Sequence, residues 1–152
     1  MNPYLLTTFE MGPAVVRRII EHIPESSLDR AIDPERFTPR EVVAHLADWE
    51  AIDRKRLSAG VERPGSAIQP YDEVQMALDH QYSQSDINAQ LLRYANERKV
   101  TARYVRGLRP DDMRNTVYHP ERGILTVDDL CNLIIAHDLY HVEQLSAYLE
   151  QS

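Results

Sequence analysis

Two histidines, His137 and His141, stand four residues apart near the carboxyl end of the chain. On an α-helix, residues i and i+4 lie on one face, so both imidazole rings could bind one metal ion. The two rings interrupt an apolar stripe with helical spacing, formed by Leu130, Ile134, Leu145 and Tyr148. Polar rings on a face that is turned to the core need a partner, because burying them unpaired is costly. A shared metal ion is one such partner.

A third histidine, His45, lies on a second apolar stripe, in which Val42, Trp49 and Ile52 follow at intervals of three and four residues. If the two helices are neighbours, the three rings converge. Three neutral imidazoles would leave a position open for water or substrate, as zinc and nickel sites in enzymes do. The alternative for each histidine is a core residue that is satisfied by ordinary hydrogen bonds.

Four main helices are expected to position these rings, because apolar residues recur at helical spacing and capping signals precede three of the four segments. Their ranges are about 3–23, 38–58, 85–108 and 126–149, with caps at Thr38, Ser85 and Thr126. Gly12-Pro13 should kink or restart the first helix. Residues 71–81 also look helical, and residues 113–125 form a connector. The sequence therefore predicts an all-α, four-helix bundle with a long, partly helical crossover, in a single domain that spans residues 1–152.

Composition excludes several classes of partner. The 152-residue chain has a formal net charge of −7, which repels phosphate backbones, so nucleic acid is not an expected partner. No apolar stretch reaches membrane-spanning length, and no secretory signal is visible after Met1, so the expected location is the cytoplasm. The only cysteine, Cys131, points about 240° away from His137 around the helix, and is interpreted as a buried structural thiol.

Two charged residues on the core-facing stripes are further candidates. Asp48 follows His45 by three residues, and could accept a proton during catalysis or support a ligand, although an exposed helix carboxylate is an equal alternative. Arg98 occupies a core-type position in the third helix. It could bind an anionic group of a substrate, but an internal ion pair with an acidic residue, or a side chain that reaches the surface, is favoured over that role.

Other residues near the histidines receive lesser roles. Trp49 is expected to form a wall of the pocket, and His119 could reach its mouth from the connector. Asp138 lies off the histidine stripe, so it is expected at the edge or on the surface. Tyr140 is interpreted as a packing residue, and His80 as a surface histidine with no visible partner.

Three stretches of the chain resemble the DinB-like family of helical-bundle metalloproteins. They are residues 37–48 (FTPREVVAHLAD), 123–126 (GILT) and 136–145 (AHDLYHVEQL), of which the last is the most specific. The resemblance implies an up-down-down-up order of the four helices, a metal triad formed by His45, His137 and His141, and frequent homodimers. Family activities range from YfiT-like metal-dependent hydrolases to transferases that use a low-molecular-weight thiol as cosubstrate.

The favoured hypothesis is a metal-dependent enzyme with a three-histidine site that holds a divalent ion, zinc or nickel. Water or a low-molecular-weight thiol would attack a small-molecule electrophile, with Asp48 as the proton acceptor. The alternative is a noncatalytic bundle in which the metal only stabilises an interaction module. No fourth protein ligand is evident at suitable spacing, which favours the open site of an enzyme over a closed structural site.

Overall fold

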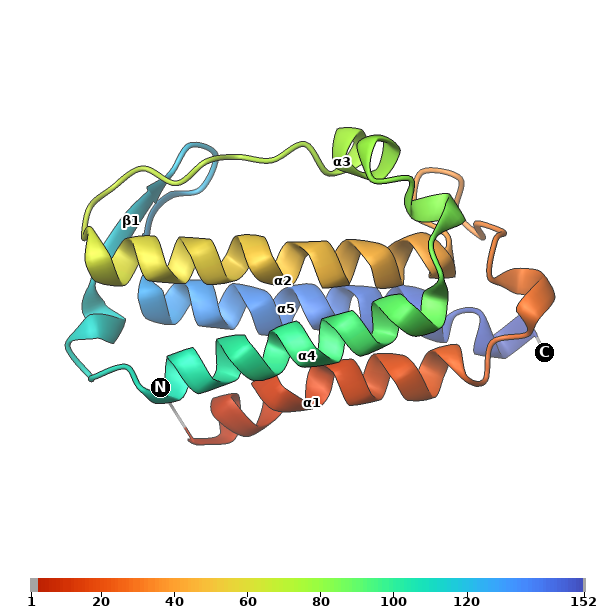
Figure 1. The fold of residues 1–152 in the computed structure, drawn as a ribbon, viewed down its shortest axis with the longest axis horizontal. Helices are drawn as coiled ribbons and strands as arrows, with labels where there is room; N and C mark the ends of the chain where they lie inside the picture. Colours follow the sequence, from red (N-terminus) through yellow and green to blue (C-terminus); the bar gives the residue numbers. More distant parts are fainter. Residues whose placement is uncertain (1–2, 152) are drawn as a thin grey trace.

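The computed structural model describes residues 3–151, so residues 1, 2 and 152 of the expected domain lie outside the described part of the chain. Four long helices dominate it: α1 (Pro3–Ile20), α2 (Pro39–Glu62), α4 (Ile87–Arg106) and α5 (Val127–Ser146). They lie side by side along the long axis of the molecule (Figure 1). The predicted all-α bundle is therefore confirmed. Within residues 3–151, no helix combines the length and apolar character that a membrane crossing requires.

The helices follow the up-down-down-up order that the resemblance implied. Helices α1 and α5 run in one direction along the bundle, and α2 and α4 run in the other (Figure 1). Helix α1 packs against α4 and α5, and α2 packs against the same two helices. Two pairs of neighbours, α2 with α4 and α1 with α5, are therefore parallel. Because α2 and α4 are consecutive long helices, the connection between them must return along the length of the bundle.

The first long connection joins α2 to α4 and contains the short helix α3 (Glu73–Asp79) and a 3-10 turn (Tyr82–Gln84). It passes over the outer side of α2 (Figure 1). Residues 71–81 were predicted to be helical, and the helix occupies the middle of that range. The side chain of Asp72 caps α3 by accepting a hydrogen bond from the Gln75 N–H at 2.9 Å.

The second long connection contains a β-hairpin that the sequence analysis did not predict. Strands β1 (Thr116–His119) and β2 (Gly123–Thr126) pair antiparallel, with Val117 opposite Leu125. Gly123 has a φ of +75°, a conformation that favours glycine at the end of the turn. The start of the first connection also bonds to this hairpin, because Ile68 N–H donates to the Tyr118 carbonyl at 2.9 Å.

Several helix boundaries differ from the predicted ones: α1, α4 and α5 end two or three residues early, and two further differences have a clear cause. Helix α2 continues through Gly60 to Glu62 instead of ending near residue 58. A Cβ atom at Gly60 would lie 2.8 Å from Val127 and 3.2 Å from Val117, so this glycine permits close packing and does not end the helix. Helix α4 is capped by Asp86, whose carboxylate accepts from the Ala89 N–H at 2.9 Å, and not by the neighbouring serine.

Helix α1 passes through Pro13 without a break. A proline lacks an N–H, so the carbonyl of Phe9, four residues earlier, loses its helical partner. The guanidinium of Arg98 replaces that partner, because its Nη1 donates to the Phe9 carbonyl at 2.6 Å. Arg98 thereby compensates the proline from a different helix.

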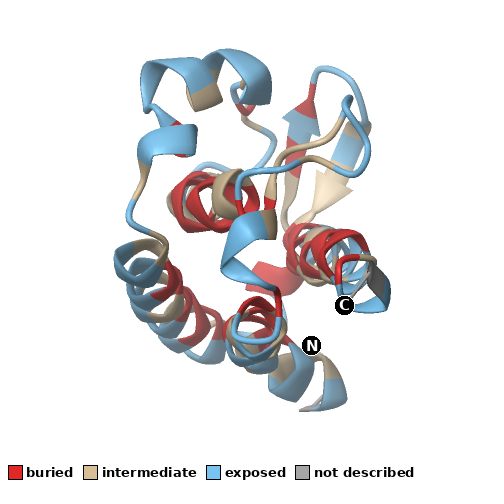
Figure 2. Ribbon diagram, turned by 90° about the vertical axis from the view of Figure 1, so that its right-hand side faces the viewer, coloured by how far each residue is buried: buried red, intermediate tan, exposed pale blue. Residues whose placement is uncertain are grey.

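The buried side chains form two apolar clusters along the bundle, with charge between them. The cluster near the α1–α2 connection includes Val16, Val43, Leu91 and Leu145. The cluster near the hairpin includes Phe9, Leu57, Val105 and Ile134. Burial is concentrated where the helices face one another (Figure 2).

A charged layer separates the two clusters. We use this name for Glu50 of α2, Arg98 of α4 and Asp138 of α5, which are all buried and lie at the same level of the bundle. Gly12 of α1 reaches the same level. A Cβ atom there would lie 2.1 Å from Asp138 Oδ2, so only glycine leaves room for the carboxylate.

Candidate metal centre

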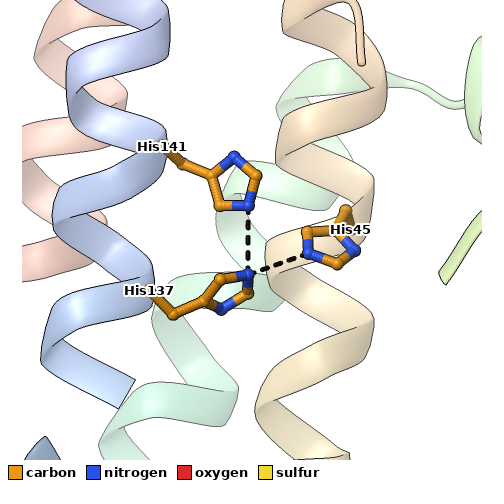
Figure 3. Close-up of side chains that lie close together, drawn as sticks. All are labelled: His45, His137 and His141. Carbon is orange, nitrogen blue, oxygen red and sulfur yellow. Dashed lines mark hydrogen bonds between the residues drawn. The ribbon is translucent and has the colours of Figure 1, made fainter. Parts of the chain in front are cut away.

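His45 on α2 and His137 and His141 on α5 bring their Nε2 atoms together (Figure 3). The Nε2 atom of His137 lies 2.9 Å from that of His45 and 3.0 Å from that of His141. One nitrogen from each ring lies within 4.8 Å of the others. The i, i+4 spacing on α5 and the α2–α5 packing thus produce the convergence that the sequence predicted.

The three rings are held in the neutral form. Burial lowers the pKa of His45 well below its ordinary value, and the neighbouring His137 and His141 lower it further. Burial, followed by the charge of His141, lowers the pKa of His137 to about 3. Burial also lowers the pKa of His141 to about 4, although a hydrogen bond to Gln144 opposes the shift. Neutral imidazoles present free lone pairs, which a metal requires.

The orientation of His141 is fixed by a chain of hydrogen bonds. Gln144 Nε2 donates to the Phe37 carbonyl at 2.7 Å, so the amide oxygen of Gln144 faces His141. That oxygen lies 2.9 Å from His141 Nδ1, which must therefore carry the proton. The lone pair of His141 is left on Nε2, toward the other two rings. Histidines that bind metals are commonly held in this way by their second nitrogen.

The cluster fits a cation better than it fits hydrogen bonds alone. His137 Nε2 has either one hydrogen or one lone pair, yet it faces two nitrogens at hydrogen-bond distance. One of the two contacts therefore stays unsatisfied in neutral rings, and Nδ1 of His45 is also buried without a partner. A divalent ion that accepts three lone pairs at once would satisfy the Nε2 atoms.

A pocket of about 410 Å³ opens beside the cluster. Its lining includes His137 and His141, as well as Trp49, whose ring centroid lies 4.9 Å from that of His45. The expected wall residue, Trp49, is thus in place, and His119 of β1 also lines the pocket, as predicted for its mouth. Tyr140 is half exposed, and its ring stacks under Arg36 at 4.4 Å. A cavity next to the ligands gives a small molecule access to a bound ion.

Asp48 lies outside this pocket lining and has other partners. Its carboxylate accepts from the Tyr82 hydroxyl at 2.9 Å and also contacts His80 and Arg93. Burial would raise the pKa of Asp48, but the bonds from His80, Arg93 and Tyr82 lower it overall. These contacts attach the end of the α2–α4 connection to α2, and the predicted role of Asp48 as proton acceptor stays a prediction. The expectation that His80 lacks a partner was wrong.

Arg98 forms the internal ion pair that the sequence analysis favoured. Its Nε donates to Glu50 at 2.8 Å, and its two terminal nitrogens donate to Asp138 at 2.6 and 2.9 Å. The expectation that Asp138 lies at the edge or on the surface was wrong, because only 6% of it is exposed. Asp138 is next to His137 in sequence but faces α1 and α4, where Gly12 leaves space for it.

Four charged residues near the cluster escaped the sequence analysis. Glu73 of α3 places its carboxylate Oε2 3.8 Å from His45 Nε2. Asp53 and Arg56 of α2, and Arg122 of the hairpin turn, line the pocket. The spacing of Asp53, eight residues after His45 on the same helical face, could have identified it. Glu73 and Arg122 lie on connections, whose positions no helical pattern predicts.

The single cysteine has the expected structural role. Cys131 is fully buried within the apolar cluster near the hairpin. Burial raises the pKa of its thiol to about 12, so the thiolate is scarce near neutral pH and a nucleophilic role is disfavoured.

Comparison with known proteins gives consistent matches. The family model of the DinB superfamily matches residues 8–145. YfiT of Bacillus subtilis is 26% identical over 144 residues, which are 93% of this chain and 80% of that protein. A protein of Oceanobacillus iheyensis is 25% identical over 136 residues, which are 89% of this chain and 78% of that protein. Both names propose a metal-dependent hydrolase.

Solved structures agree on the fold. The structure of YfiT, described as a probable metal-dependent hydrolase with an unusual four-helix bundle topology, matches with a TM-score of 0.91 at 22% identity. The match covers 99% of this chain and 89% of that chain. A mycothiol-dependent maleylpyruvate isomerase matches with a TM-score of 0.75 at 12% identity, over 93% of this chain and 59% of that chain.

Proposed function

The chain belongs to the DinB superfamily, and we propose that it is a metal-dependent enzyme that acts on a small electrophile in the pocket beside His45, His137 and His141. The observation that carries the proposal is the convergence of three neutral imidazoles, two of which, His137 and His141, line an open pocket. Its relatives, with names that propose metal-dependent hydrolases, support the same conclusion.

The three histidines would hold a divalent ion, with zinc and nickel as the best candidates for an all-imidazole donor set. When bound, the ion would supply Lewis-acid activation of a water or thiol and of the electrophile. The bond from Gln144 keeps His141 in the tautomer that can bind the ion, and burial keeps all three rings unprotonated. Trp49 limits the access of water from one side of the cluster.

Two carboxylates are placed to handle protons. Glu73 lies 3.8 Å from His45 Nε2 and is the better placed of the two to accept a proton from a nucleophile at the cluster. Asp53 lies further along the pocket, and burial, followed by the charge of Glu50, raises its pKa to about 7. A group with that pKa can accept and return a proton near neutral pH.

Hydrolysis and thiol transfer are two versions of this function, and they differ in the nucleophile. The hydrolase version follows from the names of the relatives. The thiol version is supported by the fold shared with a mycothiol-dependent isomerase. A noncatalytic, metal-stabilised module is less well supported, because a pocket of about 410 Å³ adjoins the ligands.

Metal content tests the proposal directly. Protein purified without an affinity tag should contain close to one divalent ion per chain, measured by elemental analysis. His45→Ala, His137→Ala and His141→Ala should each lose it. His22→Ala is the matched control, because His22 is exposed, lies in the turn after α1, and its ring contacts the nearby Arg18 carbonyl at 2.7 Å. Full metal content in all three cluster variants would overturn the proposal.

Cobalt substitution separates an enzyme from a structural site. The visible spectrum of bound cobalt reports coordination number, and an open site should change its spectrum when azide or mercaptoethanol is added. A response to mercaptoethanol alone would favour the thiol version, whereas a response to azide alone would favour water. A fully loaded protein that responds to neither ligand would support the noncatalytic module instead.

A further inference from the structure

Three arginines line the pocket beside the histidine cluster, and one of them, Arg36, is paired with Glu143 at 3.1 Å. The other two, Arg56 and Arg122, come from different elements. Arg56 projects from α2, and Arg122 belongs to the turn between β1 and β2. Neither is explained by the proposed metal chemistry, since guanidinium groups do not bind cations. Their contacts indicate what they would bind instead.

Arg56 is held in place but is incompletely paired. Its guanidinium carbon lies 5.7 Å from the Trp49 ring centroid and 5.8 Å from that of Tyr71, so the group contacts both aromatic rings. Only 11% of its side chain is exposed, and its Nε is buried without a hydrogen-bond partner among residues 3–151. Its Nη2 donates to the Gln69 carbonyl at 3.4 Å, which is a long bond. The nearest carboxylate oxygen, on Asp53, is 3.5 Å away, which is long for a charge-assisted bond.

Arg122 also has donors to spare. Within the described residues no carboxylate lies in ion-pair range of Arg122, and its nearest polar contact is His119 Nε2 at 3.2 Å. The Glu121 N–H already donates to the other ring nitrogen of His119 at 3.2 Å. In a neutral ring Nε2 then carries the proton and cannot accept from Arg122. The exposed guanidinium is therefore free to bind a ligand.

Both arginines line the pocket that His119, His137 and His141 also line. The Arg122 guanidinium contacts His119 Nε2 at 3.2 Å, and after burial the charges of Arg122 and Arg56 are the next causes that lower the pKa of His119. A group bound by the two arginines would therefore lie beside the histidine cluster.

We propose that Arg56 and Arg122 together bind a carboxylate group of the small molecule that reacts at the histidine cluster. The assignment of this carboxylate to a reactant rests on the proposed function, whereas the anion site itself does not. Guanidinium groups match the two oxygens of a carboxylate and can bind both at once. Three carboxyl side chains also line the pocket, those of Glu35, Asp53 and Glu73, so a singly charged group fits better than a doubly charged phosphate.

The chain contains a built-in reporter for the test. Trp49 is its only tryptophan, and its ring lies under the Arg56 guanidinium. Butyrate and its neutral isostere butyramide should be titrated into metal-free protein at about pH 7, where the depressed pKa values keep His137 and His141 neutral. Butyrate should change the tryptophan fluorescence and saturate, whereas butyramide should bind on the order of tenfold more weakly or not at all.

Variants identify the residues. Arg122→Gln lies in an exposed turn, so it should fold normally and weaken butyrate binding on the order of tenfold. Arg56→Gln should weaken it at least as much. Arg103→Gln, on the exposed side of α4, makes the same charge change away from the pocket and should leave the affinity unchanged. The proposal would be overturned if butyrate and butyramide bound with equal affinity. It would also be overturned if Arg103→Gln and Arg122→Gln lowered the affinity for butyrate by the same factor.

Metal-loaded protein then shows which reactant carries the carboxylate. If the thiol carries it, mercaptopropionate should bind more tightly than its amide, and Arg122→Gln should abolish the difference. If the electrophile carries it, the two thiols should bind equally while butyrate still binds through the arginines. The metal content of the same variants separates the anion site from the proposed metal-dependent function. Arg122→Gln should lose affinity for butyrate but retain the ion. Loss of metal from wild-type protein would contradict the proposed function and leave the butyrate result intact.

Discussion

Gly12→Ala should destabilise the protein, although alanine is the better helix former. In an exposed helix interior the change would stabilise by about 1 kcal/mol. Here the added Cβ would lie 2.1 Å from Asp138 Oδ2 and 3.1 Å from Arg98 Nη1. Both partners are buried, so neither can swing into solvent. Either α1 moves away from α5, or the carboxylate leaves its guanidinium.

The magnitude follows from these two alternatives. Overpacking a core costs about 1–3 kcal/mol, and separating a buried ion pair costs about 3–5 kcal/mol. After subtraction of the gain in helix propensity, the net loss should be about 0–2 kcal/mol if α1 moves and about 2–4 kcal/mol if the ion pair separates. For a chain of this size, 1 kcal/mol corresponds to roughly 2–4 °C, so the midpoint of thermal unfolding should fall, by up to about 15 °C.

Gly107→Ala is the matched control for this substitution. Gly107 caps α4 with a φ of −80°, and its new Cβ would lie 3.4 Å from the Tyr104 carbonyl and 3.8 Å from the Arg103 carbonyl, which are ordinary contacts. Its stability should stay within about 1 kcal/mol of wild type. Gly12→Ala should also cost much less in an Asp138→Ala background, where the colliding oxygen is gone. A Gly12→Ala protein that melts at or above the wild-type temperature would refute the close approach of α1 to the charged layer.

Three further predictions concern pH, Asp48 and assembly. Metal-free protein should lose stability as pH falls below about 6.5: the pKa values of His137 and His141 in the folded state are about 3 and 4, so the unfolded chain binds protons first. Each of the two should cost about 2 kcal/mol at pH 5, and urea titrations that give equal stability at pH 7 and pH 5 would contradict this. Asp48→Asn should lower the free energy of unfolding by about 1–3 kcal/mol without changing metal content, because it weakens the buried bond from Tyr82. An unchanged free energy of unfolding would argue that Asp48 does not hold the α2–α4 connection against α2. The family resemblance predicts a homodimer, so light scattering at micromolar concentration should give twice the mass of one chain, and a monomer mass would disprove it.

The helices were predictable because their signals are local. Thr38 and Thr126 cap α2 and α5 with the side-chain bonds that the sequence suggested. The three histidines were identified for the same reason, since i, i+4 spacing and apolar stripes define which face of a helix is buried. An internal ion pair of Arg98 was one of the favoured alternatives, because this residue occupies a core-type position at helical spacing.

The hairpin and the charged layer were not predictable by the same reasoning. Each strand has only four residues, too few for alternation to stand out from chance. The partners of Arg98 come from other helices, 48 and 40 residues away, and nothing local indicates that Glu50 and Asp138 meet there. Gly60 was mistaken for a helix end, because glycine that permits close packing and glycine that ends a helix look alike in a sequence.

The charged layer determines how the helices can be arranged along one another. A shift of α4 by one turn, about 5.4 Å, would carry Arg98 into an apolar cluster and leave Glu50 and Asp138 without a cation. Buried charges without partners cost several kcal/mol, so neighbouring registers are strongly disfavoured. If the charged layer were replaced by apolar residues, the core would tolerate a shift of one helix along another. It would also tolerate a simpler helix order with short loops. The ion pairs thus select one arrangement among many, and this axial register is the one that keeps His45 level with His137 and His141.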